Sequence, residues 1–152
     1  MSVQLSTGLR NGMLNATGFT EAFANGVMYI YSGPQPVNAD AAVQGTLLGI
    51  VTKAGGAFSF GTSTNGLNFA APAAGVVSKD GNTWQMTGLA AGTAGWFRLM
   101  GNATDALGAS TSLPRLDGSV ANVGGDLNVS NVNIAVGAPT TVDVWTFTLP
   151  AN

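Results

Sequence analysis

The sequence predicts an all-β protein: a single antiparallel β-sandwich of jelly-roll type with one or two short N-terminal helices. Three observations predict this class. The 152 residues include 22 glycines, and with the abundant Ala, Thr and Asn they favour turns and short strands. Short apolar runs after residue 26 alternate with turn residues. Only the first 25 residues carry apolar side chains at helical spacing.

The first segment, residues 1–26, is expected to be helical and to precede a β-sandwich domain in residues 27–152. Ser6 or Thr7 can cap the first helix, and a second helical turn is expected at residues 20–24. Apolar residues recur every four positions in the first helix, at Leu5, Leu9 and Met13. This spacing places them on one face of a helix.

Strands are expected from residue 27 onward. Residues 27–31 are continuously apolar, which predicts a central strand. Pro34 and Pro36 then take the chain out of the sheet, because proline cannot donate a hydrogen bond to a strand ladder. The small and polar residues 101–113 are predicted to form a long loop. Further strands are expected at residues 46–52, 58–60, 83–87, 95–100 and 116–120.

The apolar positions change phase in the C-terminal third. Leu127 and Val129 are odd, whereas Val132 and Ile134 are even. Because side chains alternate with period two in a strand, a bulge or tight turn is expected at residues 130–131. The core is expected to contain Tyr29 or Ile30, Leu48, Ile50, Trp84, Phe97, Leu99, Trp145, Phe147 and Leu149.

Charge is scarce in this chain. Only 12 residues are charged, the net charge is −2, and there is no histidine or cysteine. Ordinary domains carry about 25% charged residues, against 8% here. The composition excludes Ser–His–Asp, Cys–His and zinc chemistry, and no basic run suits nucleic acid. No apolar stretch is long enough to span a membrane, and the N-terminus lacks a signal-peptide pattern. We expect a non-enzymatic subunit of a larger assembly with no cofactor and no metal.

The aspartates are the remaining candidates for chemistry. Three of them lie in pairs that are typical of turns, namely Asp80-Gly81, Asp117-Gly118 and Gly125-Asp126. Asp143 falls in a predicted strand and is expected to face solvent or to pair with Arg98. Structural roles in turns are therefore favoured over a catalytic carboxylate pair.

Tryptophan offers a different class of function. Trp84, Trp96 and Trp145 could stack on sugars in a glycan-binding module for host attachment, which requires at least one exposed aromatic ring in a shallow groove. Each lies in a predicted strand among apolar neighbours. Core packing is therefore the favoured interpretation.

Three parts of the chain resemble small structural proteins of tailed bacteriophages. They are Thr7 to Met13, Tyr31-Ser32-Gly33-Pro34-Gln35-Pro36 with the following residues to Leu48, and Gly95-Trp96-Phe97-Arg98-Leu99 with Leu116 to Val120 and Gly125 to Asn128. The resemblance implies a head decoration, or cement, protein on the capsid surface of the virion, made in the host cytoplasm. Its implied partners are the major capsid protein and copies of itself, as a dimer or trimer. A tail tube or fibre-associated subunit is the alternative.

Two segments are expected to contact neighbouring subunits. The helical segment offers more apolar surface than two short helices can easily hide, and docking on the chain's own sheet is the equal alternative. The arm after residue 33 is held extended by its prolines. The candidate partner-binding residues are Leu9, Met13, Phe19, Phe23, Pro34, Gln35 and Pro36. The sequence does not decide whether the loop at residues 101–113 has a host-binding role.

Overall fold

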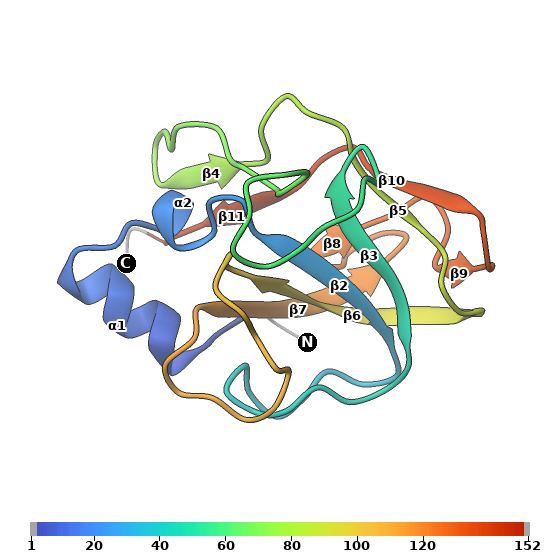
Figure 1. Cartoon of the computed structure of the whole chain (residues 1–152), viewed down its shortest axis with the longest axis horizontal. Helices are drawn as coiled ribbons and strands as arrows, with labels where there is room; N and C mark the ends of the chain where they lie inside the picture. Colours follow the sequence, from blue (N-terminus) through green and yellow to red (C-terminus); the bar gives the residue numbers. More distant parts are fainter. Residues whose placement is uncertain (1–2, 151–152) are drawn as a thin grey trace.

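A computed structural model describes residues 3–150 of the chain. These residues form a mainly β protein, with a nine-stranded sheet, a two-stranded sheet and two short N-terminal helices, and the sheet does not close into a barrel (Figure 1). The helices are α1 (Thr7–Asn15) and α2 (Phe19–Ala22). The strands are β1 (Gln4–Leu5), β2 (Val27–Ser32), β3 (Leu47–Lys53), β4 (Val76–Ser78), β5 (Trp84–Thr87), β6 (Gly92–Met100), β7 (Arg115–Ala121), β8 (Leu127–Asn128), β9 (Asn133–Ile134), β10 (Pro139–Val142) and β11 (Thr146–Thr148).

The large sheet runs in the order β1-β7-β6-β2-β3-β5-β10, with β8 added to β7 and β9 added to β6. All its pairings are antiparallel except that of β8 with β7. The apolar run that begins at Val27 is the central strand β2, as predicted. The predicted break at residues 130–131 is also confirmed, because β8 and β9 on either side of it pair with different strands. The expected strand at residues 58–60 is absent from the described chain, since these residues are irregular and lead into a turn.

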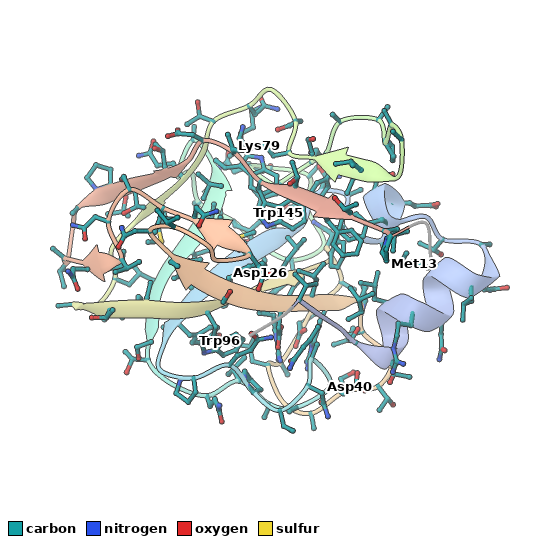
Figure 2. The ribbon with its side chains drawn as sticks, turned by 180° about the vertical axis from the view of Figure 1, so that it is seen from behind. Met13, Asp40, Lys79, Trp96, Asp126 and Trp145 are labelled. Carbon is teal, nitrogen blue, oxygen red and sulfur yellow. The ribbon has the colours of Figure 1, made fainter. Side chains whose placement is uncertain are left out.

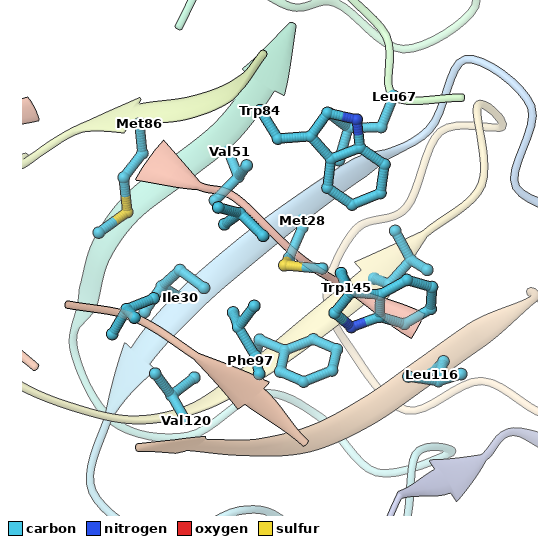
Figure 3. Packing of buried hydrophobic residues seen from close by; sticks show 14 of the residues in the cluster. Met28, Ile30, Val51, Leu67, Trp84, Met86, Phe97, Leu116, Val120 and Trp145 are labelled. Carbon is cyan, nitrogen blue, oxygen red and sulfur yellow. The ribbon is translucent and has the colours of Figure 1, made fainter. Parts of the chain in front are cut away.

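The two faces of the large sheet differ in chemistry. The register aligns Gln4, Asp117, Arg98 and Tyr29 in one row across four neighbouring strands. Directly opposed residues point to the same side of an antiparallel sheet, so these four side chains share one face. We call it the polar face for this row, although Ile50, Trp96 and Met100 also lie on it. The neighbouring positions in the same strands point to the other face, where they build the hydrophobic core (Figure 3).

The core is closed by the two-stranded sheet and the helices. Phe147 of β11 stacks on Phe19 of α2 with ring centroids 4.8 Å apart, and Trp145 stacks on Trp84 at 6.2 Å. Most of the expected core residues are buried, but two of these predictions were wrong. Leu149 is 47% exposed. Ile50 is only partly buried and lies outside the core cluster, because it pairs with Tyr29 and shares the other face of the sheet. Leu149 follows β11 and borders an open hollow of about 250 Å³, which the core does not fill.

Helix α1 is fixed at its start by Ser6, one of the two predicted caps. The Ser6 hydroxyl oxygen accepts from the amide of Leu9 at 3.1 Å, which satisfies an amide at the start of the helix. The same hydroxyl donates to the carbonyl of Leu113 and accepts from the amide of Arg115. The cap therefore also ties the helix to the start of β7. Leu9 points into the core and is buried.

Candidate functional site

Two ion pairs are buried on the polar face of the large sheet. Arg98 donates from Nε and Nη2 to the two carboxylate oxygens of Asp117, at 2.8 and 2.7 Å. Arg115 binds Asp105 in the same two-pronged way, at 2.7 and 2.6 Å. All four side chains are buried. One sequence-based prediction was wrong here, because Asp117 is a strand residue rather than a turn residue. Asp143 was expected to face solvent or to pair with Arg98, and it is exposed to solvent.

The arm of residues 33–46 and the loop of residues 101–114 cover this layer. The arm is not extended throughout as expected, because the chain turns at residues 37–41, where the amide of Ala41 donates to the carbonyl of Asn38. The carbonyl of Ala41 in the arm accepts from Nη1 of Arg98 at 3.0 Å. The arm and the loop also bond to each other, from the amide of Val43 to the carbonyl of Leu107 and from the amide of Ser110 to the carbonyl of Asp40. In Figure 2, Trp96 and Asp40 lie below the strands of the large sheet, and Trp145 and Lys79 lie above them. The ion pairs thus hold two long irregular segments on the sheet.

The titratable groups in this region respond to burial and to their neighbours. Burial raises the pKa of Tyr31 to about 12. Burial also raises the pKa of Asp117 by more than the bonds and charge of Arg98 lower it. For Asp40, partial burial favours a higher pKa, but hydrogen bonds from the hydroxyl and amide of Thr7 and the charges of Arg10 and Arg115 outweigh it, so the pKa is lowered.

The four buried charged side chains of this layer are already paired with one another. Each carboxylate is matched by a guanidinium at hydrogen-bond distance, and water does not reach either pair. Several polar atoms nearby have no partner in residues 3–150, namely Tyr31 Oη, Trp96 Nε1, Gln4 Oε1 and both amide atoms of Gln35. Among the described residues, no group of three or more potential metal ligands lies together.

The candidate partner-binding residues divide into buried and accessible positions. Leu9, Phe19 and Phe23 belong to the chain's own core, so the helices dock on their own sheet, which was the alternative expectation. In the arm, Gln35 and Pro36 are buried. Only Pro34 is exposed, and Met13 is partly buried. Of the two segments expected to contact neighbours, the arm is accessible at its tip, where Val37 is 83% exposed.

The three tryptophans are all buried. Trp84, Trp96 and Trp145 are 1%, 0% and 3% exposed, respectively. None of them presents a ring on which a sugar could stack. The observation on which a glycan-binding module most depends is therefore missing.

A groove of about 650 Å³ opens on the other side of the molecule, between the segment around β8 and the segment around β11. Val3, Val129, Trp145 and Phe147 give it an apolar lining. Its rim is polar and carries two carboxylates, with Asp126 and Trp145 both labelled in Figure 2. The polar lining residues are Asn122, Asp126, Asn128, Ser130, Thr141, Asp143, Thr146 and Thr148.

The carboxylates of this groove differ in their bonding. Asp126 accepts from both the amide and the hydroxyl of Ser119 at 2.8 Å, which fixes its orientation. Asp143 is exposed. The sequence singled out both aspartates only as turn or strand residues, because the fold alone brings positions 122–130 and 141–148 to one groove. The buried partners Asp105 and Arg115 also gave no local signal.

The comparisons with known proteins add no relative. No protein-family model, curated protein or solved structure matches this chain. In the part of the chain that the structure describes, no helix is long and apolar enough to cross a membrane.

Proposed function

We propose that this chain is a non-enzymatic structural protein of a tailed-bacteriophage virion, a decoration protein that binds and stabilises the major capsid shell. The resemblance of three segments to such proteins suggests the class. The observation that carries the proposal is the poverty of charge on the surface. Of the 12 charged residues, four are buried in the two ion pairs, which leaves eight for the outside.

Such a surface fits a subunit that is largely covered by its neighbours. Surfaces that face water throughout carry roughly 25–35% charged residues. Here the exposed positions of residues 3–150 hold mostly small and polar residues, together with seven large apolar side chains. They are Leu14, Val37, Leu89, Val123, Val136, Val144 and Leu149. A shell that binds only the folded protein also stabilises it by mass action.

The fold is compatible with a load-bearing role. We propose that the two-stranded sheet, together with the strands that fold over the core, forms the second layer of a jelly-roll-type β-sandwich. The buried ion pairs hold the arm and the long loop on the sheet, so these two segments are presented in one conformation. We further propose that the protein assembles on the capsid surface as a dimer or trimer, without nucleic acid or membrane.

Separation of heads from tails in purified particles tests this proposal. We expect quantitative mass spectrometry to find the chain in heads, in a fixed ratio to the major capsid protein. We also expect heads that lack the chain to break at a lower temperature than heads that carry it. Detection only in tails would favour the tail-tube or fibre alternative, and detection in neither would reject a virion role.

A further inference from the structure

The groove between β8 and β11 is bordered by strand edges that have no partner. Directly before and after β11, the carbonyl of Trp145 accepts from the amide of Lys79, and the amide of Leu149 donates to the carbonyl of Gly75, so these two residues bond toward the β4 side. Backbone groups alternate sides along an antiparallel strand, so Thr146 and Thr148 point their amides and carbonyls the other way. None of these four groups is bonded within residues 3–150.

The opposite rim of the groove shows the same feature. Val129 donates its amide to Ala121 of β7 at 3.0 Å. Asn128, one position earlier in the parallel pair, therefore points its backbone amide and carbonyl away from β7. These two groups also have no partner among the described residues, and Asn128 lines the groove.

The apolar floor and the acidic rim of the groove complement the two faces of a strand that would bind in it. The floor is apolar and contains the indole of Trp145, which is 3% exposed and whose Nε1 hydrogen has no acceptor in the described chain. The rim carries the carboxylates of Asp126 and Asp143 and no lysine or arginine. A strand with apolar residues facing inward and a basic residue facing outward complements both surfaces.

The charge of the chain argues against a second copy as the source of that strand. The arm of residues 33–46 contains no lysine or arginine. Arg98 and Arg115 are buried, and Nζ of Lys79 is held by the carbonyls of Asp80 and Asn82. The other cations, one in α1 and one at the end of β3, do not lie in free extended segments.

We infer that the groove binds an extended segment of a different protein that carries a lysine or arginine, and that this segment pairs with the edges of β8 and β11. The inference rests on the proposed function only where it identifies the partner as a component of the virion shell. The unpaired strand edges and the acidic rim of the groove do not depend on the proposed function.

Two matched pairs of variants test the inference on particles that lack the chain. Thr146→Pro removes an edge amide that the fold does not use, whereas Thr146→Ala keeps it. Asp143→Lys reverses a rim charge, and Glu21→Lys makes the same change on exposed Glu21 in α2. We expect Thr146→Pro and Asp143→Lys to lower incorporation about tenfold, and their controls to match the wild type. Equal incorporation of all four, with unchanged melting temperatures, would overturn the inference and leave the proposed function standing.

If the wild-type protein does not bind particles, the proposed function is rejected. A peptide experiment still tests the inference in that case. The probe is the hexapeptide acetyl-Thr-Val-Lys-Val-Thr-Val-amide, and its twin carries Glu in place of Lys. We expect the Lys peptide to slow amide hydrogen exchange at Asn128, Thr146 and Thr148, and the Glu peptide to have little effect. Slowing by neither peptide, or equal slowing by both, would count against the inference. So would a cross-link from the groove to a second copy of the chain.

Discussion

Arg98 and Asp117 face each other across β6 and β7 with two hydrogen bonds of 2.8 and 2.7 Å, and neither side chain is exposed to water. A guanidinium and a carboxylate lose their hydration when they are buried, and only close pairing compensates for that loss. The third bond, from Arg98 to the carbonyl of Ala41, fastens the arm to the sheet. This one side chain therefore links three segments that are distant in sequence.

Removal of Arg98 is expected to be strongly destabilising. Arg98→Met leaves Asp117 buried without its partner, which costs about 3–5 kcal/mol of unfolding free energy. Urea unfolding at neutral pH measures the loss. Lys53→Met is the control, because Lys53 is exposed and its loss should change stability by less than about 0.5 kcal/mol. Similar midpoints for the two variants would show that the buried pair contributes little.

The two glycines of α1 should respond in opposite ways to alanine. A Cβ atom on Gly12 meets only the Cβ of Thr17 at 3.7 Å, so Gly12→Ala should stabilise the protein by up to about 1 kcal/mol through helix propensity. A Cβ atom on Gly8 runs into the backbone of Ser112. Gly8→Ala should therefore destabilise the protein, although helix propensity alone predicts a gain.

Thermal melts of both glycine variants check this contrast. A rise in the melting temperature for Gly8→Ala would mean that the loop at residues 101–114 moves away from the helix at no cost. The expected fall would confirm close packing between α1 and this loop.

Periodicity was sufficient to find the parts of the chain that alternate regularly. The central strand at Val27, the Ser6 cap and the burial of Trp84 follow from local pattern. The ion pairs did not follow, because Asp117-Gly118 has the composition of a turn and its pairing with Arg98 is set by strand register. A register of this kind is a property of two strands, and no single segment encodes it.

The docking of the helices and the groove on the surface could not be predicted from local sequence pattern either. Leu9 and Phe23 were expected to face either a partner or their own sheet, and only the fold decides that they are buried. The groove between β8 and β11 exists because the C-terminal strand crosses the core beside a segment some 20 residues earlier. Its unpaired backbone edges leave no trace in side-chain composition.

Acid should reveal the role of Asp40. Its pKa is lowered in the folded protein, so its charge stabilises the fold above the unfolded pKa of about 4, and this contribution is lost as the pH falls through the folded value. Asp40→Asn should lower the unfolding free energy by about 1 kcal/mol at pH 7, because the Thr7 amide at the start of the helix then donates to a neutral oxygen instead of a carboxylate. Below pH 4 the two proteins should converge in unfolding free energy. A constant difference down to pH 2 would contradict this account.

Alkali should report on Tyr31. Its pKa is raised to about 12, so the neutral phenol stabilises the fold, fully below pH 10 and progressively less as the pH rises toward 12. Absorbance at 295 nm should show tyrosine ionisation well above the ordinary value of about 10. Tyr31→Phe should remove the higher step. It should leave stability at pH 7 nearly unchanged, because the buried hydroxyl has no partner in residues 3–150.

Deletion of residues 1–25 should unfold the protein rather than release an intact β domain. The segment supplies β1, which pairs with β7, and the side chains of Leu9, Phe19 and Phe23, which lie in the main core. Each buried large apolar side chain contributes about 2–5 kcal/mol, so the loss of three is comparable to the whole unfolding free energy of a typical domain, about 5–15 kcal/mol. Circular dichroism and amide-proton dispersion of the truncated chain measure the outcome. The matched control is Leu14→Ser in the full chain, because Leu14 is 87% exposed on the same helix and should be neutral for folding. A truncated chain with native-like dispersion would show that the β domain is independent and that the helices act on its surface.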